Sequence, residues 1–155
     1  MRGLVAGAAA AIMLSALSAN AQDTAKPAEQ AAAPEPYQPD LGDFMALQQM
    51  RHIKIWFAGS AGNWPLADYE IHELEEGFDD VTKLLGGDIV DQNVAAPITA
   101  LHKAVDDKNQ SAFFTAFDQL NTGCNACHRT LGHGFIVIQR PTVLPYTDQA
   151  FAPQK

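Results

Sequence analysis

Residues 111–131 read Ser-Ala-Phe-Phe-Thr-Ala-Phe-Asp-Gln-Leu-Asn-Thr-Gly-Cys-Asn-Ala-Cys-His-Arg-Thr-Leu. The apolar residues and the cysteines of this run recur at spacings of 4, 3, 4, 3 and 4, at Phe113, Phe117, Leu120, Cys124, Cys127 and Leu131. Residues at such spacings lie on one face of an α-helix. The run therefore predicts an amphipathic helix that begins near Asn109 or Ser111 and turns both cysteines toward the protein interior.

The same run contains a C-x-x-C-H motif at Cys124, Cys127 and His128, and this motif uses both cysteines of the chain. It is the signature of covalent c-type haem attachment. Two thiols on one helix face can form thioethers with the two vinyl groups of one porphyrin. His128 can then bind the iron as the proximal axial ligand. The motif predicts one covalent haem c with its iron.

Two other interpretations of the motif have less support. A thioredoxin-like dithiol needs C-x-x-C where a strand passes into a helix, whereas the residues before Cys124 are predicted to be helical. A zinc site needs a fourth ligand at metal-like spacing, and in the sequence His133 is the only nearby residue that qualifies.

The N-terminus predicts export. Residues 1–21 contain one basic residue, an apolar stretch, and Ala19-Asn20-Ala21, which fits signal-peptidase cleavage before Gln22. The apolar stretch is too short for a secure membrane anchor, and no cysteine follows it to accept a lipid. Covalent haem attachment in bacteria takes place outside the cytoplasmic membrane, so both signals predict a periplasmic protein without a membrane span after cleavage.

The mature chain is expected to be one small acidic domain behind a tether. Residues 22–40 are rich in Pro and Ala and are predicted to be a flexible linker, which leaves residues 41–155 for the haem domain. Removing residues 1–21 moves the formal charge from −8 to −9. This charge disfavours nucleic acid as a partner and favours a redox partner protein with a basic docking patch.

Three further helices are predicted before this run. The first covers Asp43 to Ala58 and stops at Gly59; its residues are apolar on nearly every side, with one stripe at Ala46, Met50, Ile53 and Phe57. The second begins after Asn63-Trp64-Pro65, ends near Gly86-Gly87, and carries a seam at Ala67, Ile71, Leu74, Phe78, Val81 and Leu85. The third starts near Pro97 and stops around 106–109.

The fold class that follows is an all-α four-helix bundle with the haem near the end of its last helix. Gly132, His133 and Gly134 break that helix. The short β-branched run 135–138 has no second strand to pair with, so residues from about 132 are expected to form an extended C-terminal tail over the domain.

Four helices with C-x-x-C-H late in the last one resemble the class II c-type cytochromes, the cytochrome c′ and cytochrome c-556 group. The resemblance covers roughly residues 44–131 and rests on Cys124, Cys127 and His128. Arg51, followed eight residues later by Gly59, also looks similar to the first-helix pattern of that group. In that register the resemblance implies that a residue near Ile55 faces the distal side of the haem.

The sixth iron ligand decides the activity of such a protein. A histidine or methionine gives a closed iron suited to electron transfer, whereas an aliphatic residue leaves a site for NO or CO. His52 is the first candidate for the sixth ligand, because it lies one turn before Ile55, and Met50 is the weaker candidate. An open site with Ile55 over the iron is the third alternative.

The expected function is periplasmic electron transfer by Fe(II)/Fe(III) cycling. The alternative is a gas-binding or sensing haem protein with an open distal site. The chain is not expected to be an enzyme, because the sequence has no catalytic constellation or phosphate loop. A weak haem peroxidase is disfavoured, since no Arg and His pair is clearly placed on a distal face. The broadly apolar first helix would allow a homodimer, by analogy with class II cytochromes.

Overall fold

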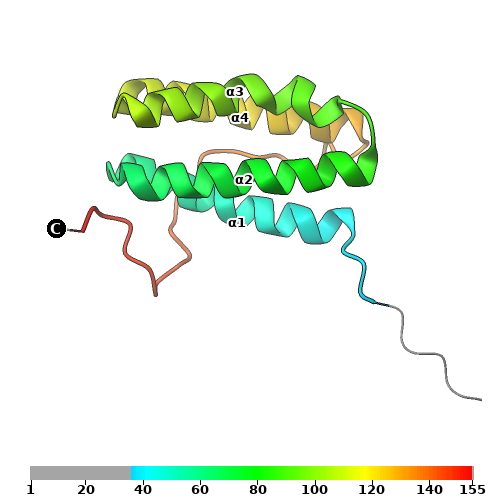
Figure 1. Cartoon of the computed structure of the whole chain (residues 1–155), viewed down its shortest axis with the longest axis horizontal. Helices are drawn as coiled ribbons and strands as arrows, with labels where there is room; N and C mark the ends of the chain where they lie inside the picture. Colours follow the sequence, from blue (N-terminus) through cyan, green and yellow to red (C-terminus); the bar gives the residue numbers. More distant parts are fainter. Residues whose placement is uncertain (1–35, 155) are drawn as a thin grey trace, which may run out of the picture. The chain divides into compact units, whose positions relative to one another are not determined.

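The computed structural model describes residues 36–154, and within them the chain forms four α-helices and no strand. The predicted signal peptide, and the linker except for residues 36–40, lie outside the described residues. The helices are α1 at Leu41–Ser60, α2 at Trp64–Leu85, α3 at Ile89–Asp106 and α4 at Gln110–Thr130 (Figure 1). This arrangement is the predicted all-α four-helix bundle.

The helices form two antiparallel pairs. Short loops at 61–63, 86–88 and 107–109 join successive helices, so each helix lies beside the next one in the chain. α1 packs closely on α2, and α3 packs closely on α4 (Figure 1). α2 contacts α3 less extensively, and α1 makes few contacts with α4. On the α1–α4 side the helices themselves therefore pack least closely against each other.

Side-chain caps fix where the helices begin. Asp40 and Asp43 form a reciprocal capping box at the start of α1. Asn63 caps α2, whose first turn contains a proline, and Asn109 caps α4 by accepting a hydrogen bond from the Ala112 N–H at 3.0 Å. Gly86, with a φ of +70°, ends α2. The predicted limits of α2 and the predicted start of α4 are confirmed.

The prediction for the third helix was wrong at its start, because α3 begins at Ile89 and contains Pro97 in its interior. A proline removes one helical N–H, so the Asn93 carbonyl loses its usual donor four residues later. That carbonyl faces Gly123 of α4 so closely that a Cβ there would clash with its oxygen. Val90 and Val94, which precede the proline, are buried, and their packing keeps this first half helical.

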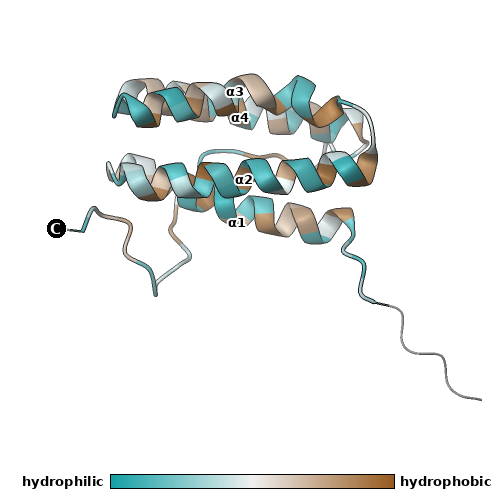
Figure 2. Cartoon of the chain, in the orientation of Figure 1, coloured by the Kyte–Doolittle hydropathy of each residue, from teal (hydrophilic) through white to brown (hydrophobic). Residues whose placement is uncertain are grey.

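The predicted apolar stripe of α1 was also wrong. The buried side of α1 consists of Gln48, His52, Ile55, Ala58 and Gly59 rather than the stripe through Met50. Because α1 carries hydrophobic residues on several sides, hydrophobicity alone does not select its inward face (Figure 2). Two polar side chains are buried because they have partners. Gln48 Nε2 donates to the Leu74 carbonyl at 2.8 Å, and His52 bonds to α4.

The residues after α4 form neither helix nor strand as far as 154, and they cover the α1–α4 side of the bundle. They first run back along α4, where Arg140 makes two hydrogen bonds of 2.7 Å with the Asp118 carboxylate. The Arg140 guanidinium also lies 4.9 Å from the centre of the Trp56 ring of α1. Further on, Phe151 is buried beside Phe57, with ring centres 6.3 Å apart. This segment, residues 131–154, is called the tail below.

The interior has a solid half and a hollow half. At the end of the bundle that holds the α1–α2 loop, large side chains such as Phe113, Phe117 and Leu101 are fully buried. At the opposite end, where α4 finishes, the helices enclose a cavity. Both cysteines lie at this hollow end.

Candidate functional site

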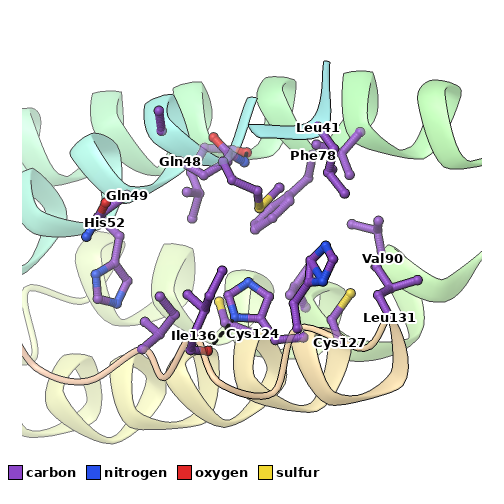
Figure 3. A pocket seen from close by; sticks show the side chains of 18 of the residues that line it. Leu41, Gln48, Gln49, His52, Phe78, Val90, Cys124, Cys127, Leu131 and Ile136 are labelled. Atoms are coloured by element: carbon purple, nitrogen blue, oxygen red, sulfur yellow. Dashed lines mark hydrogen bonds between the residues drawn. The ribbon is translucent and has the colours of Figure 1, made fainter. Parts of the chain in front are cut away.

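The cavity has a volume of about 360 Å³, which lies within the range of small-molecule and cofactor sites. All four helices contribute to its wall, and the tail adds His133, Ile136 and Ile138. The wall is mostly apolar, with aliphatic and aromatic side chains at Leu41, Leu74, Phe78, Val81, Leu85, Val90, Val94, Leu120 and Leu131. Figure 3 shows α1 and α2 on one side of this space and α4 with the tail on the other. The cavity suits a flat, largely apolar molecule.

The two cysteines lie on the α4 wall of this cavity, as the helical spacing predicts (Figure 3). They are not joined in a disulfide. Burial, and next the nearby Cys127 thiol, raise the pKa of Cys124 to about 12, and burial also raises the pKa of Cys127. Both side chains are therefore neutral thiols at physiological pH. A redox-active dithiol needs the opposite, a lowered thiol pKa, so this electrostatic environment disfavours that interpretation.

His128 also lines the cavity, and its ring is held by the tail. The distance from His128 Nδ1 to the Ile136 carbonyl oxygen is 2.8 Å. Because a carbonyl only accepts hydrogen bonds, Nδ1 carries the proton and donates it. In the neutral imidazole this leaves the lone pair on Nε2, which is the tautomer that a histidine needs to bind a metal through Nε2.

The opposite wall of the cavity comes from α1. Met45, Gln48, Gln49 and His52 line it, and Figure 3 shows both glutamines and His52 across the cavity from Cys124. Met45 was not among the candidate ligands predicted from the sequence. Its position on the wall follows from the rotation of α1 described above.

His52 is buried at the boundary between the hollow and solid halves. Its ring centre lies 4.5 Å from that of Phe117, and its Nε2 donates to Asn121 Oδ1 over 2.6 Å. Burial lowers the pKa of His52, and the bond to Asn121 offsets this only in part. The imidazole is therefore neutral, with its Nδ1 lone pair unprotonated.

The other residues considered from sequence lie elsewhere. Met50 is half-buried and does not line the cavity. Ile55 is fully buried in the core rather than on the cavity wall. His133 lines the cavity from the tail, but among residues 36–154 no group of three His, Cys, Asp or Glu side chains is arranged to hold a metal ion.

Sequence reasoning missed three groups at this site: Met45, Asn121 and the Ile136 carbonyl. Asn121 precedes Cys124 by one helical turn, so the same helical spacing that placed the cysteines could have placed it on the cavity side. Met45 would have been found only with the correct inward face of α1. A backbone carbonyl leaves no signature in the sequence, so the partner of His128 could not be predicted.

Comparison of the chain with protein-family models, with curated proteins and with solved structures finds no match. Within the part of the chain that the structure describes, no helix is both long enough and apolar enough to cross a membrane. The chemistry of the cavity therefore carries the functional argument by itself.

Proposed function

We propose that this protein is a periplasmic c-type cytochrome that transfers electrons. Cys124 and Cys127 would hold one haem covalently, and His128 would bind its iron through Nε2. The observation that carries the proposal is the orientation of His128, whose Nδ1 donates to the Ile136 carbonyl at 2.8 Å while both cysteines line the same cavity. Histidines that bind metals almost always donate their second ring N–H in this way.

The neutral thiols suit this attachment chemistry. Each thiol adds across one vinyl double bond, so a sulfur–carbon bond forms at one vinyl carbon and a hydrogen is added to the other. This addition needs neither an oxidant nor a leaving group. Once bound, the haem supplies a one-electron Fe(II)/Fe(III) couple. The apolar wall keeps water away from it, and burial is one of the means by which a protein sets a reduction potential.

The α1 wall provides the candidates for the sixth iron ligand. Met45 lines the cavity and has a flexible thioether, so it joins His52 as a candidate. His52 can ligate only through Nδ1 or after breaking its bond to Asn121. Met50, the weaker candidate from sequence, does not line the cavity and is no longer favoured.

The engagement of His52 with Asn121 also favours a second candidate function. If His52 keeps that partner and Met45 does not bind the iron, the distal side is open to NO or CO. The protein would then be a gas-binding haem protein. CO added to the dithionite-reduced protein distinguishes the two functions, because a shifted Soret band indicates an open or labile site and an unchanged band indicates a closed one.

Haem attachment is tested by expressing the full chain in a bacterium that matures c-type cytochromes in its periplasm. We expect the purified protein to carry one haem that survives denaturing electrophoresis, with the corresponding increase in mass. The double variant Cys124→Ser, Cys127→Ser should lose the covalent haem. An exported wild-type protein with two free thiols and no haem would contradict the proposal.

The ligand set is tested with Met45→Ala and His52→Ala. The variant that removes the sixth ligand should gain CO binding and change its visible spectrum, whereas the other variant should resemble the wild type. Met50→Ala is the matched control, because Met50 lies on α1 but does not line the cavity.

A further inference from the structure

We propose that Asn125, inside the C-x-x-C-H motif, is the positioning residue that orients His128. The proposal rests on the proposed haem function, because its consequence is a property of the iron. Asn125 and Ala126 occupy the two variable positions of the motif. Asn125 does not line the cavity, so it does not touch the haem site directly.

Asn125 binds the tail through both atoms of its amide. Its Nδ2 donates to the Ile138 carbonyl at 2.8 Å, and the Ile138 N–H donates to its Oδ1 at 2.7 Å. The side chain thus makes the paired contact that a neighbouring strand would make with Ile138. Both donors and both acceptors are satisfied, and the group is partly buried, so the pair fixes the tail beside α4.

The two hydrogen bonds between Asn125 and Ile138, called the Asn125 clamp below, determine the position of the Ile136 carbonyl. The chain reverses directly after α4 at Gly132, which has a φ of +80°, and the His133 N–H donates to the His128 carbonyl at 2.7 Å. The Ile136 N–H then donates to the His133 carbonyl at 2.9 Å. The turn and the Asn125 clamp thereby hold both ends of a short segment. Between them the Ile136 carbonyl meets His128 Nδ1 at 2.8 Å.

Only asparagine among the short side chains can make both bonds. Alanine makes neither of them. Aspartate still accepts from the Ile138 N–H, but it has no donor for the Ile138 carbonyl and places a negative charge next to that carbonyl. If the clamp acts through its hydrogen bonds, Asn125→Ala should therefore have a larger effect than Asn125→Asp. Aspartate has nearly the same size as asparagine, so any effect of Asn125→Asp does not come from side-chain size.

The orientation of His128 matters for the iron because hydrogen bonding at Nδ1 increases the basicity of Nε2. A more basic axial ligand favours the ferric state and lowers the reduction potential. Releasing the tail from Asn125 should therefore raise the potential. It should also expose the Nδ1 proton to exchange with solvent.

The test compares holoprotein of the full chain in four forms: wild type, Asn125→Ala, Asn125→Asp and Gln119→Ala. Gln119 is an exposed amide on α4 that lies outside the cavity, so its variant is the matched control. The measurements are the covalent haem content, the reduction potential by spectroelectrochemistry, and the exchange rate of the His128 Nδ1 proton by NMR.

We expect all four forms to carry haem. Asn125→Ala should have a higher potential than wild type and about fivefold to tenfold faster Nδ1 exchange, which corresponds to one lost net hydrogen bond. Asn125→Asp keeps the bond from the Ile138 N–H, so it should speed Nδ1 exchange by less than Asn125→Ala does, and Gln119→Ala should match wild type. If Asn125→Ala and Asn125→Asp carry haem with the wild-type potential and exchange rate, the positioning role is overturned while the cytochrome function stands. A wild-type protein without haem overturns both.

Discussion

Burial of His52 gives the stability of the protein a specific dependence on pH. Its native pKa is below the ordinary value of 6.5, whereas in the unfolded chain it is close to that value. In the pH range between these two values the unfolded state binds a proton that the native state does not. The contribution of His52 to the free energy of unfolding therefore falls as pH decreases below about 6.5, by at most about 1.4 kcal/mol per pH unit.

Replacing His52 with glutamine should remove this contribution. The difference in stability between wild type and His52→Gln, measured by urea unfolding at several pH values from about 5 to 8, should shift in favour of the variant as pH falls. His72→Gln is the control, because His72 is exposed on α2. Parallel pH profiles for wild type and His52→Gln would show that the pKa of His52 is the same in the native and unfolded states.

A second residue-scale prediction concerns Gly123 of α4, which lies directly against the backbone of α3. A methyl group there would meet the Asn93 carbonyl, which is backbone and cannot rotate away. Gly123→Ala should destabilise the protein by about 1–3 kcal/mol in a urea titration, because the helices must separate. Gly134→Ala is the control. Its new Cβ would lie 3.2 Å from Arg129 Cγ, which belongs to a flexible side chain. Equal stabilities for the two variants would mean that α3 can shift without cost.

At the scale of single elements, α4 depends on its cap. The Asn109 side chain satisfies the Ala112 N–H at the exposed start of this helix. Asn109→Ala should lower the free energy of unfolding by about 1 kcal/mol, whereas Asn109→Asp should keep most of the stability because its carboxylate also accepts. Chemical denaturation measures both changes. If Asn109→Ala has the wild-type free energy of unfolding, the Asn109 side chain does not stabilise the start of α4.

The elements differ in how well the sequence predicted them. α2 and α4 were predictable because caps, a heptad-like seam and a terminal glycine all agreed on the same limits. α3 was mispredicted because proline usually begins a helix, whereas the buried Val90 and Val94 extend this one to the N-terminal side of Pro97. The inward face of α1 was mispredicted because its buried stripe contains Gln48 and His52. Their burial depends on partners in α2 and α4 that are distant in the sequence.

The last part of the tail packs on the bundle through the buried Phe151 and the partly buried Leu144 and Tyr146. Phe151 is buried against Phe57, and next to it the Ala152 carbonyl accepts a hydrogen bond from Asn63 at 3.4 Å. Phe151→Ala removes the apolar contact, at a cost of about 1.5–3 kcal/mol. We expect the last part of the tail to open locally while the helices stay folded.

Limited proteolysis tests this prediction. Cleavage after residue 140 should be several times faster in Phe151→Ala than in wild type, and far-UV circular dichroism should be unchanged. Val143→Ala is the matched control, since Val143 is 74% exposed. Cleavage at the wild-type rate would show that the other contacts of the tail, such as those of Arg140 with Asp118, hold it in place without Phe151.

At the scale of the whole molecule, the solid half of the bundle contains the packed core, and the hollow half contains the candidate site. Aromatic side chains fill the end near the α1–α2 loop, whereas the end with the motif leaves about 360 Å³ without protein atoms. The wall of this cavity is mostly apolar, so water inside it finds few polar partners. An apolar molecule that replaced this water would remove apolar surface from contact with solvent. The hollow half is therefore expected to gain stability from an occupant.

Preventing covalent attachment should accordingly loosen the hollow half of the molecule. We expect Cys124→Ala, Cys127→Ala to unfold at a markedly lower temperature than the holoprotein. Hydrogen exchange should be faster at the end of the bundle that holds Val90 and Leu131, while residues around Phe113 keep most of their protection. Calorimetry and hydrogen-exchange mass spectrometry measure these changes. A double variant with the holoprotein's melting temperature would show that the cavity is stable without an occupant, even if the wild-type protein carries haem.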